Sequence, residues 1–253
     1  MSIGFYTGVS GMMSYQKQMD IIAHNIANVN THGFKSSRAS FDDLLYTQMN
    51  VKVEGDNKVG HGTKIVGTDI SYGKQGGIEQ TGYALDFAIT GGDGLFAVDK
   101  MGKTEYTRNG AFGISIEGKK GYLVTDDGAY VLDKKGKSIA LQLDKNGSPV
   151  VDGAAARVGV YVFKNPYGLI PTTGSRFLES GTSGTATELS KVRKSDKSPN
   201  AVKMQVMQYS LERSNVDLGQ EMIDVIQAQR AFQLNAKVVQ TADQLDEVIN
   251  NLR

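Results

Sequence analysis

Two apolar stripes with helical spacing lie at opposite ends of the chain, and this pattern constrains the fold more than any other feature. Near the N-terminus, apolar side chains recur every seven residues at Phe5, Met12, Met19 and Ile26. A second row, three positions further on, contains Gly8, Tyr15, Ile22 and Val29. Such a repeat predicts a long helix with a seam for a partner helix. It fits an amphipathic helix packed on its own domain equally well, and only the partner distinguishes the two.

The second stripe follows Ser214 and Asn215, which are predicted to cap a helix that carries Asp217 and Glu221 in its first turns. It runs almost to the end of the chain and contains Leu218, Met222, Val225, Phe232, Ala236, Val239, Ala242, Leu245, Ile249 and Leu252. The polar face of this helix is rich in glutamine and asparagine, so that face also suits packing against neighbours. Two long stripes without a third helix nearby favour assembly, because each would otherwise leave a large apolar patch in water.

The first stripe ends in residues that terminate helices. Asn28, Asn30 and Gly33 follow one another closely, and asparagine and glycine tolerate the left-handed conformation in which helices commonly end. We therefore expect the N-terminal helix to lie within residues 1–33.

The middle of the chain has the periodicity of β-strands. Between residues 86 and 163 apolar side chains alternate, as at Val158, Val160 and Val162. Residues 108–111, Arg-Asn-Gly-Ala, are a candidate type I′ hairpin, and Asp-Lys-x-Gly turns occur at 99–102, 133–136 and 144–147. The predicted fold class is α+β, with long terminal helices paired as a coiled-coil-like inner domain and a central antiparallel β domain.

These patterns divide the chain into five segments. Residues 174–200 are rich in Gly, Ser, Thr and Lys and are expected to be surface loop, whereas Val202, Met204 and Val206 alternate as in a strand. The expected division is an N-terminal assembly helix in 1–33, an extended connecting segment in 34–80, a central β domain in 81–200, a returning strand in 201–213 and a C-terminal assembly helix in 214–253. A fragment of about residues 80–200 is expected to fold alone, since the hairpin signals lie inside it.

Composition excludes several classes of function. Lys and Arg number 28 against 27 Asp and Glu, a net charge of +1 without long blocks of either sign, so the chain has no general attraction for nucleic acid. Cysteine is absent, which excludes disulfides, zinc–cysteine sites and thiol nucleophiles. No run approaches the roughly 18 apolar residues of a membrane span. The first charged side chain is Lys17, which argues against a cleavable signal peptide.

No catalytic, cofactor or metal site is expected. Residues 92–97, Gly-Asp-Gly-Leu-Phe-Ala, match the dinucleotide pattern, but strand and turn follow instead of a helix, so we interpret them as a bend between strands. His24, His32 and His61 lack the spacing of a zinc site. The adjacent acid pairs at 42–43 and 126–127 do not make an acid–base dyad, and neither a nucleophile elbow nor a Walker loop occurs.

Several stretches resemble bacterial flagellar rod and hook proteins. SGM at residues 10–12, MDIIAHNIANVNT at 19–31, GFK at 33–35 and FDDLLY at 41–46 are similar to the N-terminal signature of the family. LERSNVD at 211–217 and QAQRAFQLN at 227–235 are similar to its C-terminal signature. LDFAI at 85–89 and YTRNG at 106–110 resemble its middle domain, so the resemblance spans nearly the whole chain.

The resemblance implies a structural protein and not an enzyme. Members of this family pass unfolded through the flagellar export apparatus without signal cleavage, and they stack helically, terminal helices innermost, into the hollow shaft that transmits torque to the hook. It implies a place in the basal body within the cell envelope and no membrane insertion. The implied partners are copies of the chain, other rod and hook subunits and the surrounding ring proteins, without nucleic acid or cofactors. The short chain favours a rod subunit over a hook protein, and the two terminal signatures favour the distal rod.

Residues on the two stripes and at the end of the first helix are the candidates for self-assembly contacts. They are Phe5, Met12, Tyr15, Met19, Ile22, Asn25, Ile26, Asn28, Asn30, Gly33, Phe34, Met222, Val225, Phe232, Val239, Leu245 and Ile249. A proximal rod or short hook protein of the same family is one alternative. A closed coiled-coil adaptor and an enzyme with a carbohydrate site on its β domain are alternatives from other functional classes.

Overall fold

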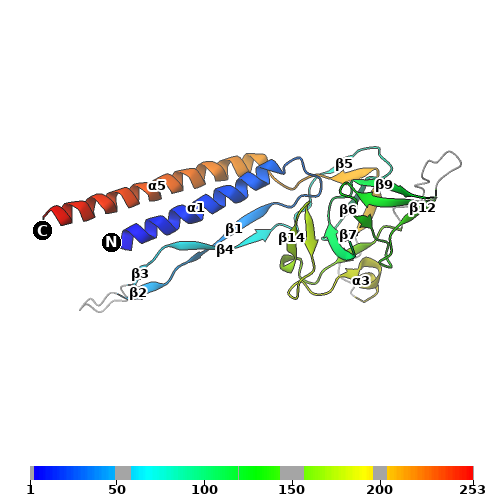
Figure 1. The fold of residues 1–253 in the computed structure, drawn as a ribbon, viewed down its shortest axis with the longest axis horizontal. Coiled ribbons are helices and arrows are strands. Elements are labelled where there is room, and N and C mark those ends of the chain that lie inside the picture. The colour runs from blue at the N-terminus through cyan, green and yellow to red at the C-terminus, as the bar shows by residue number, and fades with distance from the viewer. Residues whose placement is uncertain (1–2, 49–57, 119, 143–156, 196–203, 253) are drawn as a thin grey trace. The chain divides into compact units, whose positions relative to one another are not determined.

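The computed structural model describes residues 3–48, 58–118, 120–142, 157–195 and 204–252. The chain divides into two compact units, each made of discontinuous segments. The helical unit contains residues 1–27, 37–70 and 217–253, and the β unit contains residues 28–36 and 71–216. The fold class is α+β, with a long helix near each end of the chain and antiparallel strands between them (Figure 1).

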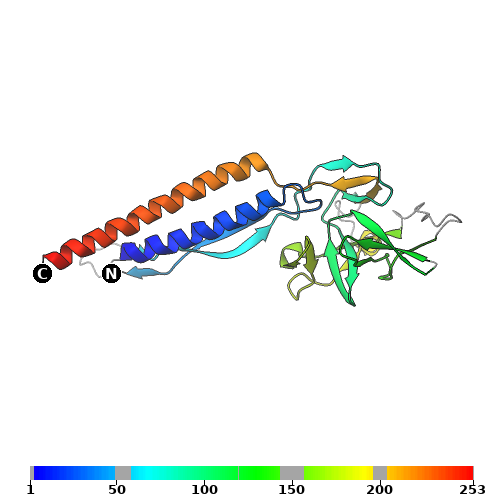
Figure 2. The same cartoon turned by 45° about the horizontal axis from the view of Figure 1, so that its top comes forward.

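In the helical unit, α1 (Ile3–Ala27) and α5 (Leu218–Asn251) lie side by side and run in opposite directions (Figures 1 and 2). The antiparallel strands β1 (Ser37–Asp43) and β4 (Thr63–Ile70) form a ribbon that packs against α1. The short strands β2 (Tyr46–Gln48) and β3 (Lys58–Gly60) pair with each other. The Ser14 hydroxyl donates to the Thr63 carbonyl oxygen at 3.0 Å, which ties the ribbon to the middle of α1.

Small residues set the distance between α1 and α5. A Cβ atom on Gly8 would lie 2.8 Å from Val239 Cγ2, and one on Gly11 would lie 2.8 Å from Asn235 Oδ1. On α5, Ala228 and Ala242 are the buried residues. The helices therefore meet where their side chains are smallest, because only such residues let the backbones approach this closely.

The β unit is a set of antiparallel strands. Its main sheet has the order β12-β10-β11-β7-β8-β15-β14; β9 also pairs with β10, and β13 pairs with β7 and with β16. Two further pairs, β6 with β17 and β5 with β18, bring residues 205–212 back onto the strands at 78–90. The strands of the main sheet are β7 (Leu95–Lys100), β8 (Lys103–Thr107), β9 (Phe112–Glu117), β10 (Lys120–Thr125), β11 (Tyr130–Val131), β12 (Ala140–Gln142), β13 (Val160–Val162), β14 (Ile170–Thr172), β15 (Arg176–Leu178) and β16 (Thr187–Glu188). The other elements are β5 (Ile78–Gln80), β6 (Phe87–Thr90), the 3-10 turn η1 (Pro166–Gly168), α3 (Leu189–Ser195), β17 (Gln205–Gln208) and β18 (Ser210–Glu212).

One hydrophobic core serves this unit. It contains Phe87, Ile89, Phe96, Val98, Phe112, Leu123, Ala129, Val131, Ile139, Leu141, Val158, Val160, Leu189 and Met204. Phe96 and Phe112 pack edge to face, with ring centroids 5.4 Å apart. Met204 comes from beyond residue 200, so the core extends outside the segment that the sequence divides off as a β domain.

The turn predictions had mixed outcomes. The turn at 99–102 is a two-residue hairpin between β7 and β8, with Met101 at φ 54° and Gly102 at φ 79°, as predicted. The turn at 133–136 is closed by the Gly136 N–H, which donates to the Asp133 carbonyl oxygen at 2.8 Å. Residues 144–147 lie outside the described residues. The dinucleotide-like stretch is a bend between β6 and β7, as expected.

The hairpin predicted at residues 108–111 was wrong. β8 and β9 pair with other strands and not with each other, and neither Asn109 nor Gly110 has the positive φ of a type I′ turn. Gly110 instead lies against the backbone of Phe87, whose N–H donates to the Gly110 carbonyl oxygen at 3.0 Å. A tertiary contact therefore overrides the local turn preference.

Two further expectations need correction. Residues 174–200 are not all loop, since β15, β16 and α3 lie among them and Leu189 packs into the core. The strand predicted around residues 202–206 lies at Gln205–Gln208, while 202 and 203 are outside the described residues. The segment predicted to be extended at 34–80 contains β1 to β5.

Candidate functional site

The α1 residues predicted for assembly occupy two different environments. Ile22 and Asn25 are buried, whereas the predicted row of Phe5, Met12, Met19 and Ile26 is half-buried. Tyr15 is also half-buried and packs against Phe41 of β1, with ring centroids 5.7 Å apart. The face of α1 that α5 covers is thus centred on Gly8 and Gly11, and the heptad row flanks that face.

The α5 residues predicted for assembly divide in the same way. Val225, Phe232 and Val239 are half-buried, whereas Met222, Leu245 and Ile249 are exposed. A wider set of large apolar side chains, three, four, seven or eleven residues apart, shares the exposed side of the helix with Leu245 and Ile249. This set, here named the α5 stripe, contains Ile223, Leu234, Val238, Leu245, Ile249 and Leu252.

The α5 stripe is notable for its exposure. Leu245 and Leu252 expose 63% and 82% of their surface. Isolated exposed apolar side chains are ordinary, whereas several on one face of a helix are typical of an interaction surface. Sequence reasoning missed Ile223, Leu234 and Val238, although their helical spacing from Leu245 is a signal that could have found them.

The remaining predicted residues follow α1 and belong to the β unit. α1 ends at Ala27, so His24 and His32 do not share a helix, and Asn28 and Asn30 lie in turns. Gly33 has φ 69°, and its N–H donates to the Glu212 carbonyl oxygen at 2.8 Å. Phe34 is buried. Gly33 and Phe34 are therefore fixed by contacts within the chain.

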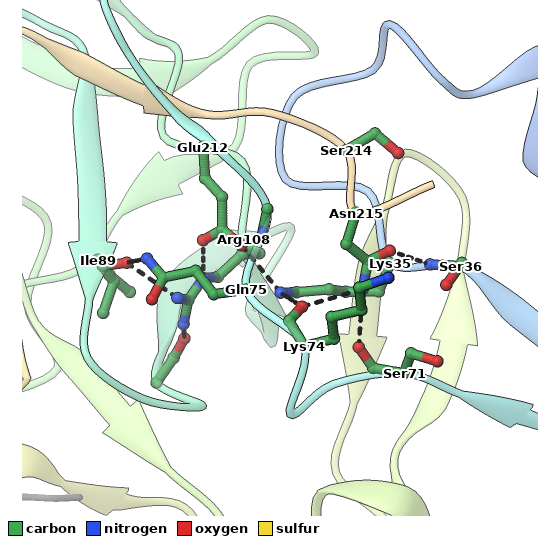
Figure 3. Close-up of polar contacts among 12 residues, drawn as sticks. Lys35, Ser36, Ser71, Lys74, Gln75, Ile89, Arg108, Glu212, Ser214 and Asn215 are labelled. Atoms are coloured by element: carbon green, nitrogen blue, oxygen red, sulfur yellow. Dashed lines mark hydrogen bonds and ion pairs between the residues drawn. The ribbon is translucent and has the colours of Figure 1, made fainter. Parts of the chain in front are cut away.

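A buried ionic cluster lies beside this turn (Figure 3). The Glu212 carboxylate, at the end of β18, accepts from Lys35 Nζ at 2.9 Å, from Arg108 Nε at 2.5 Å and from the Gly76 N–H at 3.0 Å. All three charged side chains are almost completely buried. One carboxylate thus compensates two cations that come from distant parts of the sequence.

Backbone carbonyl oxygens accept further hydrogen bonds from Lys35 and Arg108. Lys35 Nζ donates to the Lys74 carbonyl oxygen at 2.9 Å, and Arg108 donates through Nη2 to the Ile89 carbonyl oxygen at 2.9 Å and through Nη1 to that of Gly94. Such contacts are required because a buried charge without hydrogen bonds is strongly unfavourable. The cluster therefore joins the turn after α1, the loop before β5 and the ends of β6, β8 and β18.

The charges shift one another's ionisation. Burial alone would raise the pKa of the Glu212 carboxyl, but the adjacent Arg108 and Lys35 outweigh it and hold that pKa below its usual value. For Lys35, burial lowers the pKa of the ammonium group, and the attraction of Glu212 only partly opposes this shift because Arg108 repels it. Relative to its ordinary pKa, the shift of Glu212 favours its charged form, whereas that of Lys35 disfavours its charged form.

Asn215 reinforces the same junction (Figure 3). Its Oδ1 accepts from the Ser36 N–H at 2.7 Å, and its Nδ2 donates to the carbonyl oxygens of Ser71 and Lys74 at 3.0 and 2.9 Å. The prediction that Ser214 and Asn215 cap the C-terminal helix was therefore wrong. Asp217 is the N-cap, and its carboxylate accepts from the N–H groups of Gly219 and Gln220.

The geometry gives no catalytic arrangement among the described residues. In that part of the chain, no three His, Asp or Glu side chains are grouped to hold a metal ion. None of its helices combines the length and apolar character needed to cross a membrane. What the structure offers is an exposed apolar helix face and a buried polar junction, which are features of an interaction protein.

Comparisons with known proteins agree with that description. The family model "Flagella basal body rod protein" matches residues 5–35, "Flagellar hook protein FlgE/F/G D1 domain" matches 88–155, and "Flagellar basal body rod FlgEFG protein C-terminal" matches 207–252. The flagellar basal-body rod protein FlgG of Bacillus subtilis is 35% identical, with 98% of each chain covered. The chain belongs to the family of FlgG-type flagellar basal-body rod proteins.

Other relatives of the rod protein agree with this assignment. FlgG of Borreliella burgdorferi is 33% identical, over 98% of this chain and 97% of the relative. The flagellar hook-basal body complex protein FlhP of Bacillus subtilis is 29% identical, with 98% of each chain covered. The rod protein is a structural subunit of the basal body and not an enzyme, and rod proteins assemble there with other rod and hook subunits.

The three family models meet at the ionic cluster of the rod protein. Lys35 lies in the N-terminal match, Arg108 in the middle match and Glu212 in the C-terminal match. The cluster therefore contains one residue from each of the three matched segments.

Proposed function

We propose that this rod subunit polymerises helically with copies of itself and that the α5 stripe is a principal contact between subunits. The observation that carries the proposal is the row of large apolar side chains left in water along α5. Burying apolar surface contributes about 25 cal/mol per Å², so a repeated contact along this row strongly favours association. A contact between two different surfaces that does not close on itself gives a filament instead of a fixed oligomer.

In this proposal α1 and α5 act as one assembly element. Their antiparallel packing and the heptad row beside it support a coiled-coil-like pair, with Phe5, Met12, Met19 and Ile26 available to a neighbouring subunit together with the α5 stripe. Ile22, Asn25, Val225, Phe232 and Val239 then support assembly from within the pair, and Tyr15 supports it through its contact with Phe41 of β1. Asn28, Asn30, Gly33 and Phe34 would support it from the turn after α1, and Met222 extends the exposed apolar surface of α5.

In this proposal each segment expected from the sequence has its own role. Residues 1–33 and 214–253 mediate assembly, and residues 34–80 connect, contributing the β1–β4 ribbon to the helical unit. Residues 81–200 with the returning segment 201–213 form most of the β domain. Placed in the distal rod, within the cell envelope, the polymer would transmit torque to the hook and contact neighbouring rod and hook subunits and the surrounding rings. A cysteine-free chain is suited to passing unfolded through the flagellar export apparatus, since no disulfide has to form or break.

Introducing a charged side chain into the α5 stripe tests the proposal. Leu245→Glu places a carboxylate in the proposed contact, whereas Gln240→Glu adds the same charge at an exposed position of α5 outside the stripe. Light scattering against concentration and electron microscopy should show filaments for the parent protein and for Gln240→Glu but not for Leu245→Glu. Filaments of Leu245→Glu with normal appearance, or a parent protein of constant mass at all concentrations, would refute it. Constant mass would favour the closed adaptor.

A further inference from the structure

Asn25 has a contact set that differs from those of the other predicted assembly residues. Its side-chain amide bonds both backbone groups of Ser37, the first residue of β1: Oδ1 accepts from the Ser37 N–H at 2.9 Å and Nδ2 donates to the Ser37 carbonyl oxygen at 2.8 Å. The same Nδ2 donates to Glu221 Oε1 in the first turn of α5, at 3.0 Å. One amide group thus bonds α5 and β1 to α1.

Asparagine suits this position because of its hydrogen-bonding groups. The site needs one acceptor and two donors, which the amide has and which aspartate, serine and alanine lack. Asn25 is 1% exposed, so its own amide atoms depend on these hydrogen bonds rather than on water. Any substitution that removes the donors leaves the Ser37 carbonyl oxygen and the Glu221 carboxylate without this partner.

The position of the Asn25 amide lets it constrain how α1 packs against α5. Gly8 and Gly11 meet α5 at Val239 and Asn235 by close packing of small residues. Asn25 and Glu221 form a directional bond nearer the other end of the pair, between residues 196 positions apart in the chain. Packing of small residues fixes the spacing of the helices, whereas a directional bond fixes how far one can slide along the other.

We propose that Asn25 is a positioning residue that sets the register of α1 against α5. It thereby sets the register in which the heptad row of α1 and the α5 stripe face a neighbouring subunit. In this role Asn25 acts on assembly through contacts inside its own chain, not by touching a neighbour. The assembly consequence rests on the proposed function, but the register itself does not.

Distance measurement between spin labels tests the register independently of assembly. The chain has no cysteine, so Lys17→Cys and Gln229→Cys place two nitroxides at exposed positions of α1 and α5 without competing thiols. Electron–electron double resonance should give a narrow distance distribution for the parent protein and for Glu221→Gln, whose amide oxygen still accepts from Asn25. Asn25→Ala should broaden or shift it. For Asn25→Ala the critical concentration for assembly should rise about tenfold when the competent register falls to about one tenth of the subunits, because only that fraction can add to a filament.

A rescue experiment separates positioning from general destabilisation. Asn25→Asp faces Glu221 with a second carboxylate and should broaden the distribution, while the double variant Asn25→Asp/Glu221→Gln restores a donor and should narrow it again. If Asn25→Ala loses its helical circular dichroism signal, the comparison of Asn25→Asp with Asn25→Asp/Glu221→Gln tests the proposal in its place. An unchanged distribution in Asn25→Ala or Asn25→Asp, or no narrowing in the double variant, would overturn the proposal. A parent protein that never polymerises would refute the proposed function. The spin-label distances would still test the register of α1 against α5.

Discussion

At the scale of single residues, Glu212 is the charge on which the β unit depends. It is the carboxylate that bonds both Lys35 and Arg108, and it also accepts from the Gly76 N–H. Removing one member of a buried ion pair costs more than the pair itself contributes, because the remaining charges stay buried without compensation. The residue is therefore important for specifying the junction, whatever its net contribution to stability.

Glu212→Gln should lower the free energy of unfolding of the β unit by about 3–5 kcal/mol, the cost of leaving buried cations unpaired. Glu79→Gln, on the neighbouring strand β5, is the matched control, because its side chain is more than half exposed. Urea unfolding followed by near-ultraviolet circular dichroism measures both. Equal midpoints for the two variants would contradict this prediction.

Acid should reduce the difference between the parent protein and Glu212→Gln. The folded pKa of Glu212 lies below its unfolded value of 4.5, so its contribution is complete above pH 4.5 and is lost as the pH falls through the folded pKa. The difference in unfolding free energy should therefore shrink in that acid range. A difference that is constant or grows on acidification would show that Glu212 is not ionised in the cluster.

Lys35 should give a dependence of the same sign, but at high pH. Its folded pKa is lowered from 10.5, so between the two pKa values the unfolded chain binds more protons and stability rises with pH. Measured against Lys35→Met, which cannot titrate at this position, the parent protein should gain stability as the pH rises towards 10.5. Titrations common to both proteins cancel in the difference. A relative loss of stability over this range would mean that the lysine pKa is raised instead.

At the scale of elements, the sequence predicted that helices exist but not which faces they use. Apolar helical spacing correctly located α1 and α5, because apolar periodicity is a local property. For α1 it placed Phe5, Met12 and Met19 on one row of the seam and Gly8 on the other. Gly8 does approach α5 closely, together with Gly11, which the pattern did not include. Glycines in a helix add no signal to a pattern of apolar residues. A helix contact that depends on small residues is therefore hard to recognise from sequence.

Gly11→Val should separate or shift α1 and α5, because its Cβ would lie 2.8 Å from Asn235 Oδ1. Overpacking of this kind typically costs about 1–3 kcal/mol. Ala23→Val, at an exposed position of α1, introduces the same side chain without the clash and is the control. By helix propensity alone it should cost more than Gly11→Val, because glycine is a poorer helix former than alanine. Thermal unfolding followed by helical circular dichroism should show the larger loss for Gly11→Val, with recovery on adding Asn235→Ala. Equal losses for Gly11→Val and Ala23→Val would mean that the helices do not meet at Gly11.

At the scale of the whole molecule, the candidate site could be predicted only in part. Lys35, Arg108 and Glu212 each lie in a stretch that resembles the family, but no local pattern indicates that they meet, since Glu212 is 177 and 104 residues away from its partners. Arg108 was interpreted as part of a hairpin for the same reason. Short sequence patterns correctly predict turns such as 99–102, whereas contacts that join distant segments depend on the complete fold.

That dependence changes the expectation for the isolated β domain. A fragment of residues 80–200 lacks β17, which pairs with β6, and also Met204 of the core, Lys35 and Glu212. It would leave Arg108 buried without its carboxylate, at a cost of several kcal/mol, which is a large fraction of the stability of a domain. We therefore expect this fragment to show no cooperative thermal transition, whereas residues 28–216, which contain every segment of the β unit, should unfold cooperatively. Differential scanning calorimetry distinguishes the two. A cooperative transition in the shorter fragment would mean that the flanking segments attach to a domain already complete without them.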